Sequence, residues 1–277
     1  MKFTKMHGLG NDHIVIDLFR ESFPNPEQAA PKLCDRHLGI GADGLILVGP
    51  SKDYDFMMSV VNSDGSIAEM CGNGIRCLAR YVVEAGLTEK PEFVTEALDG
   101  PHRQVVRILD NRFIDVTTSM GKAKLRRSEI PMTGNESDTA IGEQLVVDGR
   151  SWEVTCLNVG NPHCVVFVDD VDAVNLSEIG PKFETHPVFP KRVNTEFVQI
   201  LDKNNIRMRV WERGCGETFA CGTGSTASVV ASILNGHTFD TVTVHLKYGD
   251  LLIEWRKHEE LFMTGGANRV YTGEIGL

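Results

Sequence analysis

The chain has 277 residues, of which 42% are hydrophobic and 24% are charged. This is the composition of an ordinary globular protein, and it excludes a disordered, collagen-like or coiled-coil chain. Acidic residues outnumber basic ones by 38 to 28, a net charge of −10, so binding to a nucleic-acid backbone is not expected. No run of about 18 apolar residues occurs, so no membrane-spanning segment is predicted either.

In the first half of the chain, short β-branched runs bounded by Gly, Pro, Asn or Asp predict strands. The pair Asn25-Pro26 predicts the start of a helix that continues to about His37. Apolar residues from Ile75 to Val83 recur at helical spacing and predict a second helix, which Gly86 ends. The predicted strands are His13–Leu18, Leu45–Val48, Asp55–Val61, Gln104–Leu109 and Arg112–Thr117.

The second half repeats this alternation of strands and helices. One helix is predicted from Leu176 to about His186. A second, from Gly222 to Gly236, contains no charged residue and must therefore be buried. The end of the chain, Thr264–Leu277, resembles a strand that returns to pair with the first half. The other predicted strands are Val154–Val159, Cys164–Val168, Phe197–Leu201, Ile206–Trp211, Val242–Leu246 and Leu251–Trp255.

The two halves match each other at an offset of 150 residues. Gly10-Asn11-Asp12-His13 aligns with Gly160-Asn161-Pro162-His163, and Cys71-Gly72-Asn73-Gly74 aligns with Cys221-Gly222-Thr223-Gly224. Two repeats are too few for a solenoid, so duplication of a whole domain is the better interpretation.

We therefore predict an α+β fold of two pseudo-symmetric domains, each a mostly antiparallel, barrel-like sheet wrapped around a central helix. The composition shifts after Asn111 toward charged and small polar residues. This shift predicts one domain from residues 1–118 with 263–277, and a second from residues 119–262.

The sequence contains seven cysteines. No pair has C-x-x-C spacing, so a zinc site is not predicted. An odd number without an export signal favours reduced thiols and a cytoplasmic protein. Four of them are interpreted as buried small hydrophobic residues and Cys215 as a loop residue; the four are Cys34, Cys77, Cys156 and Cys164.

The remaining two, Cys71 and Cys221, each precede a Gly-x-Gly turn that opens a helix. A helix N-terminus favours an anion and makes a thiolate accessible near neutral pH. Two such groups on duplicated domains suit inversion of a stereocentre, in which a thiolate removes a proton from one face of a carbon and a thiol delivers one to the other. The helix N-termini would hold the carboxylate of the substrate.

At these residues the sequence resembles the diaminopimelate epimerases, cofactor-independent enzymes that interconvert LL- and meso-diaminopimelate in lysine and cell-wall synthesis. The resemblance covers nearly the whole chain. It is carried by HGLGNDHIVID, VNSDGSIAEMCGNGIRC, GNPHCVVFVDD, RVNTEFV, WERGCGETFACGTGS and MTGGANRVYTGE. It implies a site between two domains, no cofactor, no metal and a homodimer.

The resemblance also implies a role for individual residues. Cys71 and Cys221 would be the acid/base thiols, tuned by His163 and Glu212, with Glu212 also meeting the reacting amino group. Many members of the family carry Gln where this chain has Gly44. The residues implied in substrate binding are Asn11, Asn62, Gly72, Asn73, Asn161, Asn194, Glu212, Arg213, Gly222 and Thr223. His13, which aligns with His163, is interpreted as a structural histidine.

Three alternatives stay open from the sequence. A racemase of another amino acid, such as proline or hydroxyproline, would share the paired thiols but would not need a distal set of Arg and Asn. A thiol-based metal or redox module would use the C-x₅-C pairs Cys71/Cys77 and Cys215/Cys221, whose spacing is unusual for metal ligands. A purely structural duplicated domain would not depend on either cysteine.

Overall fold

The computed structural model describes residues 1–68, 70–110, 112–257 and 259–276. The chain divides into two compact units. Unit 1 comprises Met1–Ser119 with Thr264–Leu277, and unit 2 comprises Met120–Met263. Strands β8 (Arg112–Gly121) and β17 (Glu260–Gly265) contain the two unit boundaries. Among the helices of the described residues, none has both the length and the apolar character needed to cross a bilayer.

Unit 1 is a curved sheet with one helix on each face. Its strands pair in the order β18, β1, β2, β3, β4, β6, β7 and β8, and β5 also pairs with β4. Among these pairings of the described residues, β2–β3 and β4–β6 are parallel and the others antiparallel. The elements not yet bounded are β1 (Lys2–Gly8), β2 (Asn11–Asp17), α1 (Pro26–Cys34), β3 (Gly44–Gly49), β4 (Phe56–Asn62), β5 (Ile67–Ala68), α2 (Gly72–Glu84), β6 (Glu92–Ala97), β7 (Gly100–Leu109) and β18 (Asn268–Glu274).

The alternation of side chains along β2 sorts the core of unit 1 into two layers. Ile14 and Ile16 pack toward α1, whereas Val15 packs toward α2, and all three are fully buried or nearly so. Because successive side chains of a strand point to opposite faces, His13 lies on the same face as Val15, beneath α2. The fold of unit 1 thus places residues at the beginning of β2 next to the first residues of α2.

Unit 2 has the same plan. Its strands pair in the order β9, β10, β11, β12, β13, β15 and β16, with β14 also paired to β13, and β11–β12 and β13–β15 are parallel. Its elements are β9 (Ala140–Val147), β10 (Arg150–Asn158), β11 (Pro162–Phe167), α3 (Leu176–Glu184), β12 (Asn194–Ile200), β13 (Asn205–Glu212), β14 (Gly216–Thr218), α4 (Gly222–Leu234), β15 (Thr241–Leu246) and β16 (Gly249–Arg256).

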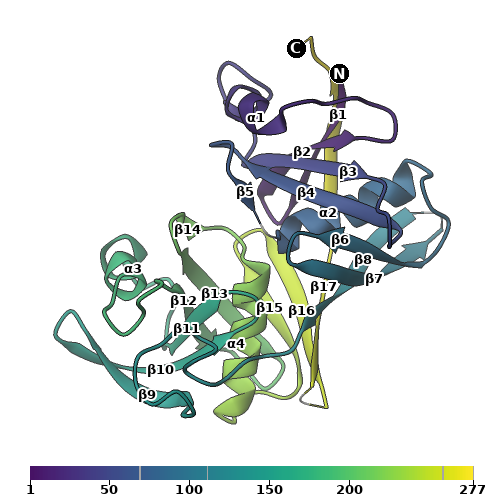
Figure 1. The fold of residues 1–277 in the computed structure, drawn as a ribbon. Coiled ribbons are helices and arrows are strands. Elements are labelled where there is room, and N and C mark those ends of the chain that lie inside the picture. The colour runs from purple at the N-terminus through teal and green to yellow at the C-terminus, as the bar shows by residue number, and fades with distance from the viewer. Residues whose placement is uncertain (69, 111, 258, 277) are drawn as a thin grey trace. The chain divides into compact units, whose positions relative to one another are not determined.

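Helix α4 is the centre of unit 2, and the strands curve around it (Figure 1). Gly222 and every residue from Gly224 to Ser232 are buried. The buried serine and threonine hydroxyls of this helix donate to carbonyl oxygens one turn earlier, for example Ser228 to Gly224 at 2.8 Å, so their burial leaves these donors paired. The expected buried helix without charges is confirmed.

The register of the strands shows that the two units are copies. His13 pairs with Gly44 in parallel strands of unit 1, and His163 pairs with Asn194 in parallel strands of unit 2, each partner displaced by the same 150 residues. The predicted α+β fold of two duplicated units, each with a mostly antiparallel sheet around a central helix, is confirmed.

The predicted ends of two helices need correction. Helix α1 ends at Cys34, not near His37, because Asp35 leaves the helical conformation and its carboxylate accepts the N–H groups of His37 and Leu38, both at 2.7 Å. Asn25 precedes α1 as predicted but has a left-handed backbone and makes no side-chain cap. Helix α3 ends at Glu184, two residues before His186.

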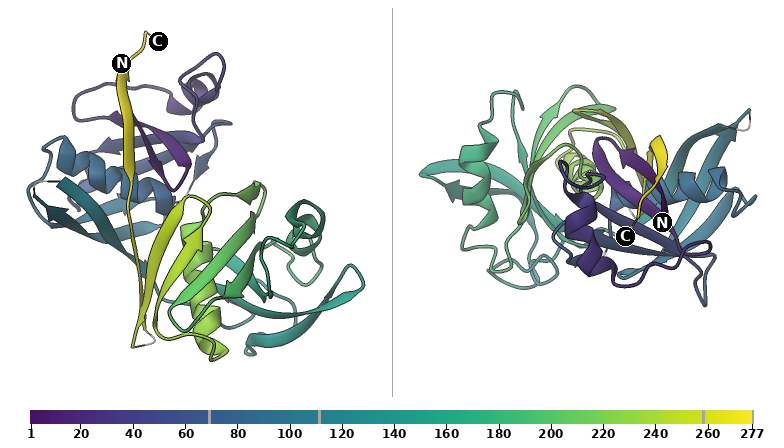
Figure 2. Two further views of the ribbon diagram at one scale, coloured as in Figure 1. Left: turned by 180° about the vertical axis from the view of Figure 1, so that it is seen from behind. Right: turned by 90° about the horizontal axis from the view of Figure 1, so that it is seen from above.

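The two ends of the chain lie side by side in unit 1 (Figure 2). Strand β18 pairs antiparallel with β1, from Lys2 opposite Glu274 to His7 opposite Asn268. The terminal ammonium of Met1 donates to the carbonyl oxygen of Ile275 at 2.8 Å. The predicted return of the last residues to the first half is confirmed.

Candidate active site

Each of the two cysteines that precede Gly-x-Gly caps the N-terminus of a central helix. Cys71 has an extended backbone (φ −135°, ψ 109°), and its sulfur accepts the N–H of Gly74 at 3.3 Å. Cys221 has nearly the same conformation (φ −125°, ψ 113°) and accepts the N–H of Gly224 at 3.3 Å. Both sulfurs therefore lie where free helix N–H groups stabilise negative charge.

The third residue of each helix is a glycine that packs closely against the cap. A Cβ on Gly74 would lie 3.2 Å from Cδ1 of Ile46 and 3.2 Å from Cβ of Cys71. A Cβ on Gly224 would lie 2.7 Å from Oε1 of Glu196. Ile46 and Glu196 are 150 residues apart, so equivalent strands place an apolar side chain in one unit and a carboxylate in the other.

We expect Gly224→Ala to destabilise the protein and Gly74→Ala to be close to neutral. In a helix Gly→Ala gains about 1 kcal/mol, whereas overpacking costs about 1–3 kcal/mol. Only the Gly224 substitution drives a methyl group into a buried carboxylate that His163 already holds. Thermal unfolding of both variants measures the difference, at roughly 2–4 °C per kcal/mol for a chain of this class. Equal melting temperatures would contradict the close approach.

In unit 1 three predicted site residues lie together. The amide oxygen of Asn11 lies 3.5 Å from the Cys71 sulfur and accepts from Nδ2 of Asn73 at 3.2 Å. Arg76, fully buried on α2, donates to the carbonyl of Gly72 at 2.7 Å and to Oδ1 of Asn73 at 2.6 Å, which orders the turn that opens the helix. Asn62 lies at the exposed end of β4, where its amide donates to Ser66 at 2.9 Å.

His13 lies against the Cys71 sulfur, which the sequence analysis did not anticipate. Nε2 of His13 is 3.8 Å from Sγ, and the ring is buried. Burial acting alone would lower the pKa of His13, but the charge and hydrogen bond of Cys71, with a further contribution from Cys77, raise it to about 10. Burial acting alone would raise the pKa of Cys71, but His13 and the N–H groups of Gly74 and Asn73 lower it. The interpretation of His13 as a purely structural residue does not account for this contact.

In unit 2 the equivalent histidine has different partners. Nδ1 of His163 is 2.7 Å from Oε1 of Glu196, and its Nε2 is 2.8 Å from Oδ1 of Asn161. His163 and Glu196 are both fully buried. Glu196 was not predicted as part of the site. The signal in the sequence is its position two residues after Asn194 on β12, the same face of the strand, where the first half has Ile46.

Cys221 lies among oxygen atoms of unit 2. Its sulfur is 3.4 Å from the Thr223 hydroxyl. The carboxylate of Glu212, whose Oε1 accepts from the Thr218 hydroxyl, acts on this sulfur through its charge. Burial raises the pKa of Cys221, and the charges of Glu212 and Glu196 raise it further, well above its ordinary value. Burial also raises the pKa of Glu212.

Asn194 links two further predicted residues. Its Oδ1 accepts the backbone N–H of Arg213 at 2.9 Å, and its Nδ2 donates to the carbonyl of Pro162 at 3.0 Å. The Arg213 side chain is exposed and donates to the carbonyl of Lys191 at 3.1 Å. The predicted residues therefore form two groups, one in each unit.

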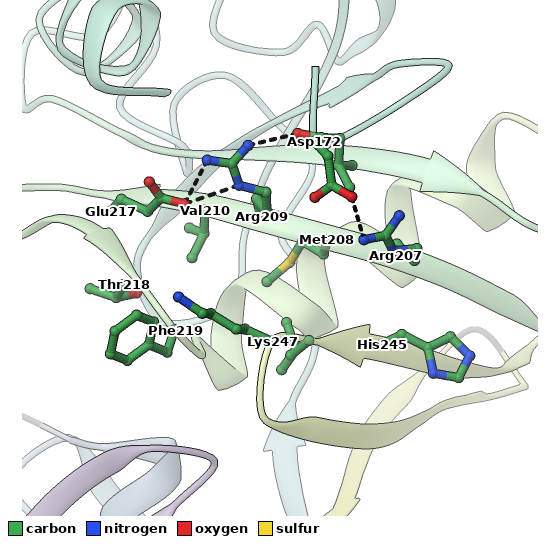
Figure 3. A pocket seen from close by; sticks show the side chains of 12 residues that line it. Asp172, Arg207, Met208, Arg209, Val210, Glu217, Thr218, Phe219, His245 and Lys247 are labelled. Atoms are coloured by element: carbon green, nitrogen blue, oxygen red, sulfur yellow. Dashed lines mark hydrogen bonds and ion pairs between the residues drawn. The ribbon is translucent and has the colours of Figure 1, made fainter. Parts of the chain in front are cut away.

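A separate pocket of about 630 Å³ in unit 2 is lined largely by β13, β14 and β15 (Figure 3). Arg207 and Arg209 are paired there with the carboxylates of Asp172 and Glu217, at 2.8 Å in both cases. One of its lining residues, Thr218, connects the pocket to the predicted site, because its hydroxyl donates to Glu212. In the described parts of the chain, no cluster of three or more His, Cys, Asp or Glu is arranged to hold a metal ion.

Comparison with known proteins identifies a family that this chain resembles over most of its length. The protein-family model described as diaminopimelate epimerase matches residues 3–126 and 155–270. The diaminopimelate epimerase of Pelotomaculum thermopropionicum is 50% identical over 277 residues, which cover 99% of this chain and 98% of that protein.

Solved structures share the fold at low sequence identity. A PhzF-family phenazine biosynthesis protein from Bacillus anthracis is 16% identical with a TM-score of 0.72, covering 100% of this chain and 99% of that one. A hydroxyproline epimerase from Agrobacterium vitis is 14% identical with a TM-score of 0.70, covering 99% of this chain and 91% of that one. At these identities the likeness concerns the fold alone.

Proposed function

The chain belongs to the diaminopimelate epimerase family, and from this premise we propose that it interconverts LL- and meso-2,6-diaminopimelate by a two-base mechanism without a cofactor. It is an isomerase, and its reaction belongs to the synthesis of lysine and of peptidoglycan precursors. The observation that carries the proposal is the duplicated cap, a cysteine sulfur at the N-terminus of the central helix in each unit.

Inversion of the α-carbon needs a base on one face and an acid on the other, which we assign to Cys71 and Cys221. One thiolate takes the α-proton and becomes a thiol, while the electron pair of the C–H bond passes to the α-carbon and the adjacent carboxylate. The other thiol gives its proton to the opposite face and becomes a thiolate. The reverse reaction exchanges the two roles, and no other reactant is consumed.

The helix N-termini supply the groups that hold the reacting carboxylate. We assign the backbone N–H groups of Gly72-Asn73 and Gly222-Thr223 to this task, because charge builds on the carboxylate as the proton leaves and N–H donors stabilise it. Arg76 supports one of these turns through its bonds to Gly72 and Asn73.

The remaining assigned residues fit recognition of an amino acid with a second amino-acid end. Glu212 would accept the reacting ammonium group, and Arg213 would pair with the distal carboxylate, since a guanidinium binds a carboxylate in bidentate fashion. Asparagine amides both donate and accept, as an amino-acid group requires. The asparagines assigned to substrate are Asn11, Asn62, Asn161 and Asn194. His163 would tune Cys221 together with Glu212.

Isotope exchange tests the reaction. We expect reduced protein, with LL-diaminopimelate in deuterated water and no added cofactor, to form the meso isomer carrying deuterium at the inverted carbon, because the delivering thiol exchanges with solvent. Mass spectrometry and chiral chromatography follow both changes. Full retention of the substrate hydrogen over many turnovers would contradict the two-thiol scheme.

The alternative is racemisation of another amino acid by the same pair of thiols. It is worth testing because a hydroxyproline epimerase shares this fold. Turnover of proline or hydroxyproline in preference to diaminopimelate would favour it. We further propose that the protein acts in the cytoplasm as a homodimer. Thiolate chemistry requires reduced cysteines, which fits a reducing compartment, and sedimentation analysis tests the dimer.

A further inference from the structure

The two units carry the same histidine in two different electrostatic settings. His13 and His163 occupy equivalent register positions, but residue 46 next to the cap in unit 1 is Ile, and the equivalent residue in unit 2 is Glu196. The carboxylate of Glu196 therefore serves as the partner of His163, whereas the apolar Ile46 takes the equivalent position near His13.

His13 is directed at the thiol. Its Nε2 lies 3.8 Å from Sγ of Cys71, and among the described residues its buried Nδ1 has no hydrogen-bond partner. Its cross-strand neighbours Met6 and Gly44 cannot titrate. Helix α2 contributes the titratable Cys71 and Cys77 and the fully buried cation Arg76, whose charge also acts on the Cys71 sulfur.

The charged groups around Cys221 are negative, whereas those around Cys71 are positive. His163 is engaged by Glu196 and Asn161 rather than by the sulfur, and the charge of a second carboxylate, Glu212, acts on Cys221 together with that of Glu196. A thiolate at Cys221 would thus form beside two carboxylates, whereas a thiolate at Cys71 forms beside an imidazolium and a guanidinium. Close unlike charges stabilise an ion in a buried setting and like charges destabilise it.

We propose that His13 is a positioning residue that holds Cys71 as the resting thiolate, while Cys221 rests as the thiol. The inference rests on the proposed function, since it assigns the starting roles of the two bases. The shifts already described agree with it: the pKa of Cys71 is lowered by its neighbours and that of Cys221 is raised. The free enzyme then holds one acid and one base before any substrate binds.

The extent of alkylation of each cysteine, measured as a function of pH, tests the proposal in the absence of substrate. Reduced protein is treated briefly with iodoacetamide between pH 5 and pH 10 (a range that spans the titration of ordinary and activated thiols), and peptide mass spectrometry quantifies labelling at each site. In the parent protein, Cys71 is expected to label at lower pH than Cys221. In His13→Asn, labelling of Cys71 at pH 7 is expected to fall by about tenfold or more, because only the thiolate reacts, while the Cys221 curve stays in place.

The matched control is His37→Asn, an exposed histidine of unit 1, which should leave both curves unchanged. Unchanged labelling of Cys71 in His13→Asn, or a parent protein in which Cys221 reacts at lower pH than Cys71, would overturn the proposal. The acidic limb of the pH profile of kcat/KM should also move to higher pH in His13→Asn, which a merely structural role would not produce. Failure of diaminopimelate turnover leaves the labelling result standing, so the two proposals fail separately.

A measurement on the parent protein keeps the test independent of how His13→Asn folds. Nitrogen-15 NMR of the histidine rings should show His13 doubly protonated through neutral pH, because the Cys71 sulfur raises the pKa of its ring to about 10. After alkylation of Cys71 the imidazolium loses its counterion and its titration should move to lower pH. A His13 ring that is already neutral at pH 7 would overturn the proposal.

Discussion

Cys71→Ala and Cys221→Ala are each expected to lower the rate of epimerisation by about 10³-fold or more, since each removes a group that transfers a proton in the reaction. Because every turnover uses both an acid and a base, the two single variants should lose similar amounts. Conversion of LL- to meso-diaminopimelate, followed by chiral chromatography, measures the effect. Neither substitution removes a large core side chain, so both variants should keep the melting temperature of the parent to within a few degrees.

Two other buried cysteines provide the controls. Cys34→Ala in unit 1 and Cys156→Ala in unit 2 remove thiols of the sheet-facing cores that take no part in the caps. Both should epimerise at close to the parent rate. A normal rate in either Cys71→Ala or Cys221→Ala would disprove the two-base assignment.

Arg213→Ala is expected to lower kcat/KM for diaminopimelate by roughly 10²–10³-fold, because truncating one member of a bound charge pair costs about 2–5 kcal/mol. In the free protein the Arg213 side chain is exposed and donates to the backbone carbonyl of Lys191, so the fold should not depend on it. The loss should therefore be confined to substrate recognition.

Inhibition by lysine distinguishes the loss of distal-end recognition in Arg213→Ala from general damage to the site. It is diaminopimelate without one of the two carboxylates, so its inhibition constant should be nearly the same in Arg213→Ala and in the parent protein. Arg256→Ala, an exposed arginine of β16 that pairs with Glu254 at 2.9 Å, is the matched control and should leave both constants unchanged. Equal losses for lysine and diaminopimelate would contradict the assignment of Arg213 to the distal carboxylate.

The duplication was predictable because the same motifs recur at one offset, and the two central helices because their signals are local. The Cys-Gly-x-Gly motifs, the helical spacing from Ile75 and the absence of charge after Gly222 are all visible in single windows of sequence. Several strands were not predicted. β1 and β9 mix charged or small residues with apolar ones, and they become strands because they pair along β2, β18 and β10.

The electrostatic difference between the two caps was not predictable in the same way. His13 and His163 look equivalent in the aligned sequence, and their surroundings differ through Ile46 and Glu196, which lie on other strands. Parallel pairing of β2 with β3 and of β11 with β12 brings these residues to the caps. The position of Glu196 two residues after Asn194, where the first half has Ile46, is the indication that the sequence provides, and the partner of Glu196 becomes evident only with the register.

The pairing of β18 with β1 bears on how the chain is completed during synthesis. All of unit 2 leaves the ribosome before residues 268–274, which supply the strand beside β1. Since domains tend to fold as units while translation proceeds, we expect the nascent unit 2 to become compact first and the earlier-made unit 1 to keep an open sheet edge until release. Stop codons placed before Asn268 should therefore yield chains that aggregate through that edge.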